Sequence, residues 1–295
     1  MKLIDGKEIA SQLKNEMAAE VEKLRSDSGR APHLAAILVG NDPASETYVK
    51  NKERACHEVG MSSSIYRLPE KATEAELMEV VDFVNKDEEI DGLIVQLPLP
   101  KGLKEEAVIA RIAPEKDVDG FHPANLGRMV LAQPSYLPAT PMGIMLLLQR
   151  SGIETEGRRC VVVGRSHIVG TPVSILLSRN RAGANCTVTL CHSKTQNLAA
   201  ICRTADILIV AIGQCEAITG EYIKKGAVVI DVGIHRVADA TKKSGFALKG
   251  DVKFDEVAPL CSYITPVPGG VGPMTIVGLL RNTLSAFKGE IYPKK

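Results

Sequence analysis

Residues 160–177 read CVVVGRSHIVGTPVSILL, and they give the strongest indication of fold in the chain. A short β-branched run, Val161 to Val163, ends at Gly164, and after a polar turn a helical apolar pattern begins near Gly170. Strand, glycine turn and helix in this order are typical of the phosphate-binding half of a βαβ unit, because N–H groups at a helix N-terminus bind anions. However, Ser166 replaces the second glycine of the usual G-x-G-x-x-G pattern, and the third glycine comes one place late. An ordinary strand-to-helix turn therefore remains an alternative.

The same alternation of strands and helices extends in both directions from this stretch. Toward the C-terminus, the pattern predicts strands at 160–163, 186–191, 206–212 and 227–232, and helices at 171–179, 196–203, 219–224 and 276–287. Toward the N-terminus, it predicts strands at 34–39, 64–68 and 91–97, and helices at 4–24, 42–59, 73–85, 105–112 and 142–149, with residues 114–141 mostly irregular. Alternating elements imply parallel strands joined by right-handed crossovers, so the sequence predicts an α/β fold.

Local signals support several of these boundaries. Asp42-Pro43 resembles a helix N-cap followed by proline at the first helical position, and Thr73 with Glu76 forms the spacing of a capping box. Glycine closes several of the later strands at their carboxyl ends, namely at Gly164, Gly213 and Gly233. In open α/β sheets ligands bind at that edge, so we expect a ligand site there.

Composition narrows the class of protein. The chain has 295 residues, of which 45% are hydrophobic and only 4% aromatic, a balance typical of α/β proteins with buried aliphatic strands. A formal net charge of +1 gives no general attraction for nucleic acid or an anionic membrane. The charged start MKLIDGKEIA is no signal peptide, and no apolar run is long enough to span a bilayer. Seven scattered cysteines without a C-x-x-C pair fit a reducing cytosol better than a disulfide framework or zinc site.

The choice of nucleotide depends on the residues that follow the second strand of the later alternation. An NAD-binding unit carries a carboxylate there for the ribose 2′-OH, but Thr187 to Cys191 is followed by His192-Ser193-Lys194. Arg165, in the first turn, points toward the same region, and a guanidinium suits a 2′-phosphate. The sequence therefore favours NADP over NAD, with a solvated polar turn as the alternative.

The first half of the chain contains candidate proton-transfer groups. Tyr48 and Lys52 are four residues apart on an expected helix and share one face, near Gln96 at the end of the third strand. Desolvation would make a lysine available as a base, although Lys and Tyr on one helix also fit a solvated face. In the DVDG loop, Asp117 and Asp119 are either substrate-binding carboxylates or turn formers.

Taken together, five stretches resemble the bifunctional methylenetetrahydrofolate dehydrogenase/methenyltetrahydrofolate cyclohydrolase (FolD) family. They are the Tyr48-x-x-x-Lys52 helix, VQLPLP at 95–100, EKDVDGFHP at 115–123, GRSHIVG at 164–170 and TPVPGGVGPMT at 265–275. The resemblance covers nearly the whole chain in order. It implies a compact, homodimeric two-domain enzyme with a cleft between the domains, the second being a Rossmann-like NADP-binding domain with a parallel sheet.

The resemblance also implies roles for individual residues. Lys52 is then the general acid/base of hydrolysis, assisted by Tyr48 and positioned by Gln96, while Asp119 holds the pterin ring. The implied substrate contacts are Tyr48, Lys52, Val95, Gln96, Leu97, Asp119, Pro268, Gly269 and Gly272, and the implied cofactor contacts are Gly164, Arg165, Ser166, Ser193 and Ile234. His167 receives no role, and the other histidines show no metal spacing. The cis-prone peptides Leu97-Pro98 and Val267-Pro268 are further candidates for sharp turns.

We divide the chain accordingly into a folate-binding catalytic domain, residues 1–140 plus 274–295, and an NADP-binding domain, residues 141–273. The expected activity is oxidation of 5,10-methylenetetrahydrofolate with NADP, followed by hydrolysis of the methenyl product to 10-formyltetrahydrofolate. Two other functions stay open: an NADP-dependent dehydrogenase of a small amino or shikimate-like acid, and a non-catalytic NADP-binding sensor.

Overall fold

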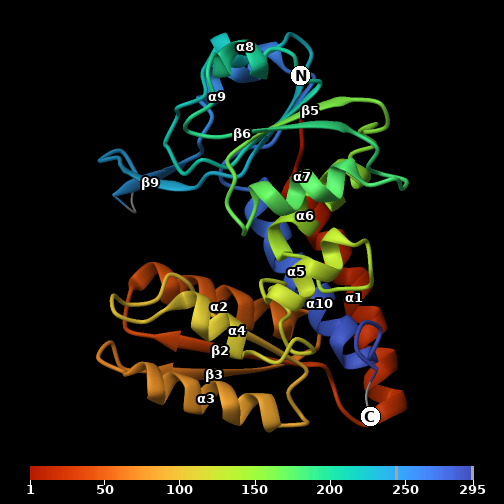
Figure 1. Cartoon of the computed structure of the whole chain (residues 1–295), viewed down its shortest axis with the longest axis vertical. Helices are drawn as coiled ribbons and strands as arrows, with labels where there is room; N and C mark the ends of the chain where they lie inside the picture. Colours follow the sequence, from red (N-terminus) through yellow and green to blue (C-terminus); the bar gives the residue numbers. More distant parts are fainter. Residues whose placement is uncertain (243–244, 294–295) are drawn as a thin grey trace. The chain divides into compact units, whose positions relative to one another are not determined.

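The computed structural model describes residues 1–242 and 245–293, and the chain divides into two compact units (Figure 1). Unit 1 comprises residues 1–11 and 140–275, and unit 2 comprises residues 12–139 and 276–295. Both are α/β, as the sequence predicts. No helix within the described residues is long and apolar enough to cross a membrane.

Unit 1 is built on a parallel sheet of six strands in the order β1-β11-β8-β7-β5-β6. The strands are β1 (Lys2–Leu3), β5 (Arg159–Val163), β6 (Thr187–Cys191), β7 (Ile207–Val210), β8 (Val228–Asp231) and β11 (Tyr263–Ile264). Because β6 and β7 flank β5 on opposite sides, the strand order reverses at β5. In such sheets the loops after the central strands diverge and leave a crevice for a ligand.

Short helices cover the sheet of unit 1. They are α6 (Ala139–Arg150), α7 (Gly170–Ser178), α8 (Leu198–Cys202), α9 (Phe254–Val257) and the 3-10 turns η1 (Gly220–Tyr222) and η2 (Ala258–Leu260). The face of β5 and β7 that carries Val161, Val163 and Leu208 packs with buried side chains of α8 and α9 and with a partly buried side chain of η1. The central strands β5, β7 and β8 are mostly aliphatic because they are buried, whereas the edge strands β1 and β6 are largely exposed.

Unit 2 contains a parallel three-stranded sheet in the order β3-β2-β4. Its elements are β2 (His33–Val39), β3 (Ser62–Leu68), β4 (Gly92–Val95), α2 (Pro43–Glu58), α3 (Glu74–Lys86), α4 (Glu105–Arg111) and α5 (Pro123–Val130), and it shares α1 (Gly6–Ser28) and α10 (Val271–Lys288) with unit 1. Alternate residues of β2 pack against buried side chains of α3 and α4, including Leu77, Val81 and Val108.

The predicted helix starts are confirmed. The Asp42 carboxylate accepts from the Ser45 N–H at 2.7 Å, with Pro43 at the first helical position of α2. Thr73 and Glu76 make both hydrogen bonds of a capping box at the start of α3. Each cap satisfies N–H groups that have no partner inside the helix.

Some local expectations need correction or addition. Residues 114–141 are mostly irregular, as expected, but they also contain α5, with the His122 ring accepting from the Ala124 N–H and Pro123 following. The helix expected at 219–224 is only the short turn η1. The helix expected at 276–287 begins earlier, at Val271. A hairpin of β9 (His235–Ala238) and β10 (Phe246–Lys249), which no pattern predicted, follows β8.

The N-terminal eleven residues lie in unit 1, whereas the domain boundaries expected from the sequence place them with residues 12–140. The cause is a long-range strand pair: β1 pairs with β11, with Lys2 opposite Tyr263. The Gly6 position adds a close approach, since a Cβ there would lie 1.8 Å from the Gly270 oxygen. Two-residue strands leave no periodicity from which this pairing could be read.

Candidate functional site

The turn between β5 and α7 is shaped by two glycines. Gly164 has a φ of +117° and lies so close to the loop after β7 that a Cβ would meet the Ala211 oxygen at 2.0 Å. A Cβ on Gly170 would lie 1.8 Å from the Gly164 oxygen. Gly164 therefore allows the tight turn, and Gly170 allows the helix to pack closely on the strand. The first and third glycines of a dinucleotide fingerprint have these two roles, although Gly170 comes one position later than the usual third glycine.

The backbone of this turn offers donors for an anion. Within the described residues, the N–H groups of Arg165, Ser166 and His167 donate to no other protein group, and all three side chains are exposed. The Ser166 hydroxyl accepts from the Val169 N–H at 3.1 Å and so holds the turn together. This arrangement fits the phosphate groups of a dinucleotide.

Arg165 and Ser193 follow neighbouring strand ends. Val163 of β5 is paired with Cys191 of β6, so Arg165 and Ser193 each lie two residues beyond the same pair. Both side chains are exposed, and His192 stands where an NAD-binding unit carries its carboxylate. Ile234, 49% exposed, follows β8 at the same edge of the sheet.

Sequence reasoning missed a buried carboxylate, Asp251, that holds the loop after β7. Asp251 is fully buried and accepts from the N–H groups of Ile212, Gly213 and Gln214 at 2.7, 3.0 and 2.9 Å. The His235 Nε2 atom lies 2.8 Å from its Oδ1. Asp251 thus fixes a loop at the edge where the candidate cofactor residues gather.

A second buried carboxylate, Asp231, ends β8 beside the first. It accepts from the N–H groups of Gly233, Asp251 and Val252 at 2.9 to 3.0 Å. Burial raises the pKa of the Asp231 carboxyl to about 6, although its hydrogen bonds act in the opposite direction. The only sequence signal for either residue was an acidic group ending an apolar strand or following a glycine.

The candidate proton-transfer groups lie in unit 2. The Lys52 Nζ donates to the Gln96 Oε1 at 3.1 Å, joining α2 to the end of β4. Gln96 is itself fixed, because its N–H donates to the Ile37 oxygen and its Nε2 to the Leu97 oxygen. The Leu97-Pro98 peptide that follows is cis, and so is Val267-Pro268, as anticipated. The side-chain oxygen of Gln96 is thereby left facing Lys52.

Of the two aspartates in the DVDG loop, Asp119 is the one available to a ligand. It is half-buried, burial raises the pKa of its carboxyl, and attraction to the Lys52 ammonium opposes that rise. Asp117 is 1% exposed and is a loop-forming residue, since its carboxylate accepts from the N–H groups of Phe121 and His122 and from the Asn125 side chain. Burial raises the pKa of Asp117 to about 7.

The remaining predicted residues fall into both units. Tyr48 precedes Lys52 by one turn of α2 and is 45% exposed, while Val95 is buried and Leu97 half-buried beside Gln96. Pro268, Gly269 and Gly272 belong to unit 1, at the start of α10. There the Gly269 oxygen accepts from the Lys7 N–H at 3.1 Å. No group of three His, Cys, Asp or Glu within the described residues is arranged to hold a metal ion.

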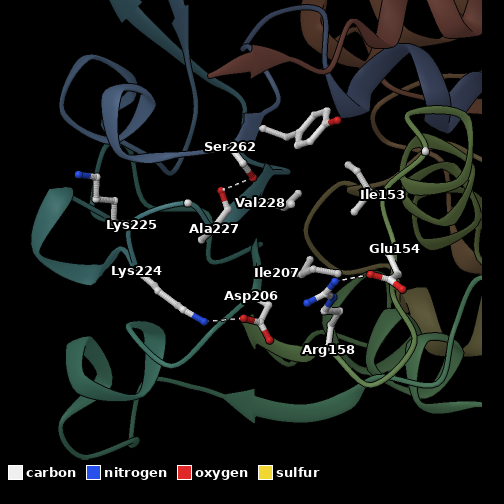
Figure 2. A pocket seen from close by; sticks show the side chains of 13 residues that line it. Ile153, Glu154, Arg158, Asp206, Ile207, Lys224, Lys225, Ala227, Val228 and Ser262 are labelled. Carbon is white, nitrogen blue, oxygen red and sulfur yellow. Dashed lines mark hydrogen bonds and ion pairs between the residues drawn. The ribbon is translucent and has the colours of Figure 1, made fainter.

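A hollow of about 410 Å³ lies at the opposite edge of the unit 1 sheet, where β7, β8 and β11 begin (Figure 2). Figure 2 shows four of its charged side chains joined in two pairs, Lys224 with Asp206 and Arg158 with Glu154, while Lys225 lies at the rim. Because the carboxyl edge is where such sheets bind ligands, we do not assign the site to this hollow.

Comparison with known proteins finds two family domains in the chain. The tetrahydrofolate dehydrogenase/cyclohydrolase catalytic-domain model matches residues 4–119, and the NAD(P)-binding-domain model of the same name matches residues 138–291. Bifunctional protein FolD of Cytophaga hutchinsonii is 60% identical over 286 residues, which are 97% of this chain and 99% of that protein.

Two solved structures resemble the whole chain. The bifunctional FolD dehydrogenase/cyclohydrolase of Campylobacter jejuni is 43% identical, with a TM-score of 0.92 over 98% of this chain and 99% of that one. The FolD enzyme of Trypanosoma brucei, solved with NADP cofactor and an inhibitor, is 41% identical, with a TM-score of 0.92 over 98% of both chains. The chain therefore belongs to the tetrahydrofolate dehydrogenase/cyclohydrolase family.

Proposed function

We propose that this protein oxidises 5,10-methylenetetrahydrofolate to 5,10-methenyltetrahydrofolate with NADP and then hydrolyses the product to 10-formyltetrahydrofolate. The observation that carries the proposal is the hydrogen bond from Lys52 to Gln96. The Asp119 carboxyl interacts electrostatically with the same Lys52 ammonium. In a chain of this family, that cluster supplies an acid/base group and a substrate anchor.

The candidate cofactor residues belong to unit 1. Gly164, Arg165 and Ser166 would hold the phosphates on the turn after β5, with Ser193 and Ile234 contacting the nucleotide from neighbouring loops. NADP, when bound, supplies the hydride acceptor. The absence of a side chain at Gly164 and Gly170 lets the turn pack closely against the loop after β7 and the start of α7, which positions the backbone N–H groups of the turn. Hydride transfer needs proximity and orientation rather than an acid or base, so no proton-transfer group is required here.

Hydrolysis of the methenyl cation does require proton transfer. Lys52 takes a proton from the attacking water and returns one to the departing ring nitrogen, and Tyr48 assists. Gln96 accepts a hydrogen bond from Lys52 and orients it without placing another charge beside it. One cluster can thus serve the second reaction while the nucleotide edge serves the first.

Folate recognition rests on Asp119. Its carboxylate can accept two hydrogen bonds from the amino-pyrimidine edge of the pterin, and Val95 and Leu97 supply apolar contacts near Gln96. The contact of Pro268, Gly269 and Gly272 with folate stays a prediction from the resemblance.

We further propose a cytoplasmic homodimer whose small-molecule partners are tetrahydrofolates, with no nucleic-acid or membrane partner. The support is an edge strand: β6 ends the six-stranded sheet and exposes Thr187, Thr189 and Leu190. An uncovered edge is a ready site for association. Sedimentation equilibrium tests the assembly, and a monomer mass at micromolar concentration would contradict it.

The proposed activity is tested by adding methylenetetrahydrofolate and NADP to the purified protein and following methenyl absorbance over time. We expect the methenyl signal to rise and then decay as 10-formyltetrahydrofolate forms. A dehydrogenase of a small amino or shikimate-like acid would turn over those acids and not folate. An NADP-binding sensor would bind cofactor without any turnover, so either result overturns the proposal.

A further inference from the structure

A series of polar contacts, part-buried at Tyr292 and buried at Asn125 and Asp117, runs from near the C-terminus to the loop that carries Asp119. The Tyr292 hydroxyl donates to the Asn125 Oδ1 at 2.9 Å. The Asn125 Nδ2 in turn donates to the Asp117 Oδ2 at 2.9 Å and to the Pro114 oxygen at 2.9 Å. Asn125 is fully buried, so water cannot replace either contact.

Asp117, the last residue in this series of contacts, fixes the backbone directly after Asp119. The Asp117 Oδ1 accepts from the Phe121 N–H at 3.1 Å, and the Oδ2 accepts from the His122 N–H at 2.8 Å. The Gly120 N–H donates to the Asp117 backbone oxygen at 3.1 Å. The loop therefore closes on the Asp117 carboxylate, which depends on Asn125 for one of its three side-chain hydrogen bonds.

The backbone directly before Asp119 is also fixed by a residue near the C-terminus of the protein. The buried Asn282 Nδ2 in α10 donates to the Val118 oxygen at 2.7 Å and to the Leu137 oxygen at 2.8 Å. The Gly120 position approaches this segment so closely that a Cβ would lie 2.6 Å from the Leu137 carbonyl carbon. Asp119 thus projects from a segment held on both sides by residues near the C-terminus.

We propose that Tyr292 is a positioning residue for Asp119, acting through Asn125 and Asp117. This inference rests on the proposed role of Asp119 in folate binding. Without the phenol hydroxyl, the Asn125 Oδ1 is a buried acceptor with no donor, and Asn125 shifts to relieve it. Its hold on Asp117 weakens, the loop samples more conformations, and Asp119 spends less time in the geometry that binds folate. A smaller competent fraction raises the apparent dissociation constant in proportion.

Tyr292→Phe isolates this effect because it removes only the hydroxyl. The ring contacts, with Tyr136 at 5.7 Å between centroids and with the Arg128 guanidinium at 4.6 Å, are retained. We expect KM for folate to rise roughly three- to tenfold in both reactions, the size expected for one neutral hydrogen bond, with kcat and NADP affinity unchanged. Tyr66→Phe, the same change on β3 outside this chain of contacts, is the matched control and should leave KM unchanged.

The double variant Tyr292→Phe with Asp119→Asn separates positioning from a general structural effect. If Tyr292 acts through Asp119, removing its hydroxyl in the Asp119→Asn background adds no further increase in KM. If the two substitutions raise KM independently, so that their effects multiply in the double variant, the inference is overturned. A fall in kcat at constant KM, or an unchanged KM, in Tyr292→Phe alone would also overturn it. Asp119→Asn alone tests the underlying role: if it leaves folate KM unchanged, the proposed folate contact fails, whatever Tyr292→Phe shows.

Discussion

At the scale of single residues, the preference for NADP depends on one guanidinium. Arg165 is exposed beside the end of β6, where no carboxylate is present to repel a 2′-phosphate. Arg165→Ala should weaken NADP binding roughly ten- to a hundredfold, the value of one charge-assisted hydrogen bond, and leave NAD binding nearly unchanged. Titration of both cofactors into the variant and the wild type measures this. Equal losses for NADP and NAD would mean that Arg165 does not contact the 2′-phosphate.

Residues that act through local chemistry could be named from the sequence, and residues that act through distant contacts could not. Lys52, Gln96 and Asp119 stand in recognisable motifs, although only the structure shows Lys52 bonded to Gln96. Asp251 and Tyr292 carry no such signal. Their partners lie 39 and 167 positions away, at Ile212 and Asn125, and a single sequence contains no trace of those pairings.

At the scale of elements, the junction of β5 and α7 depends on the absence of a side chain at Gly170. A methyl group there would lie 1.8 Å from the Gly164 oxygen, so the start of α7 must move. We expect Gly170→Ala to reduce NADP affinity by about tenfold or more, since such overpacking displaces the backbone that meets the phosphates. Hydrolysis of added methenyltetrahydrofolate, which depends on unit 2, should persist.

The matched control for Gly170→Ala is Gly127→Ala. Gly127 lies in α5, where an added Cβ meets no atom within 4 Å. Calorimetric titration of NADP into both variants gives the comparison. If Gly170→Ala binds NADP as well as Gly127→Ala does, the close packing of α7 on the turn does not shape the cofactor site.

The elements that the sequence predicted are those with continuous patterns. Aliphatic runs identify β5 and β7, and capping residues fix the starts of α2 and α3. The hairpin β9–β10 has half-exposed strands without a hydrophobic run, and α5 lies in a segment whose Pro, Gly and Asp content favoured a loop. The hairpin strands carry no continuous apolar run, whereas α5 does carry a local signal, the His122 cap followed by Pro123.

At the scale of the whole molecule, stability should depend on the protonation of Asp231. Burial raises the pKa of this carboxyl from 3.8 to about 6, so the folded protein keeps a proton that the unfolded chain has already lost. The resulting stabilisation is complete below about pH 4 and is lost as the pH rises through about 6. The total is about 3 kcal/mol, at about 1.4 kcal/mol per pKa unit.

Asp231→Asn removes this titration. Relative to the variant, the free energy of unfolding of the wild type should fall by about 3 kcal/mol between about pH 4 and pH 7, as measured by denaturant unfolding. A difference that stays constant over this range would mean that Asp231 is ionised throughout in the folded protein.

Lys52 is proposed to perform the proton transfers of hydrolysis and not to be needed for hydride transfer. Lys52→Met keeps the aliphatic length, removes the titrating group and leaves Gln96 in place. The measurement is methenyl absorbance in single-turnover reactions of this variant with methylenetetrahydrofolate and NADP. We expect hydrolysis to fall by about 10²–10⁴-fold while oxidation continues in part, so that methenyltetrahydrofolate accumulates. Loss of both steps by the same factor, with folate binding intact, would contradict it and make Lys52 an organiser of the site instead.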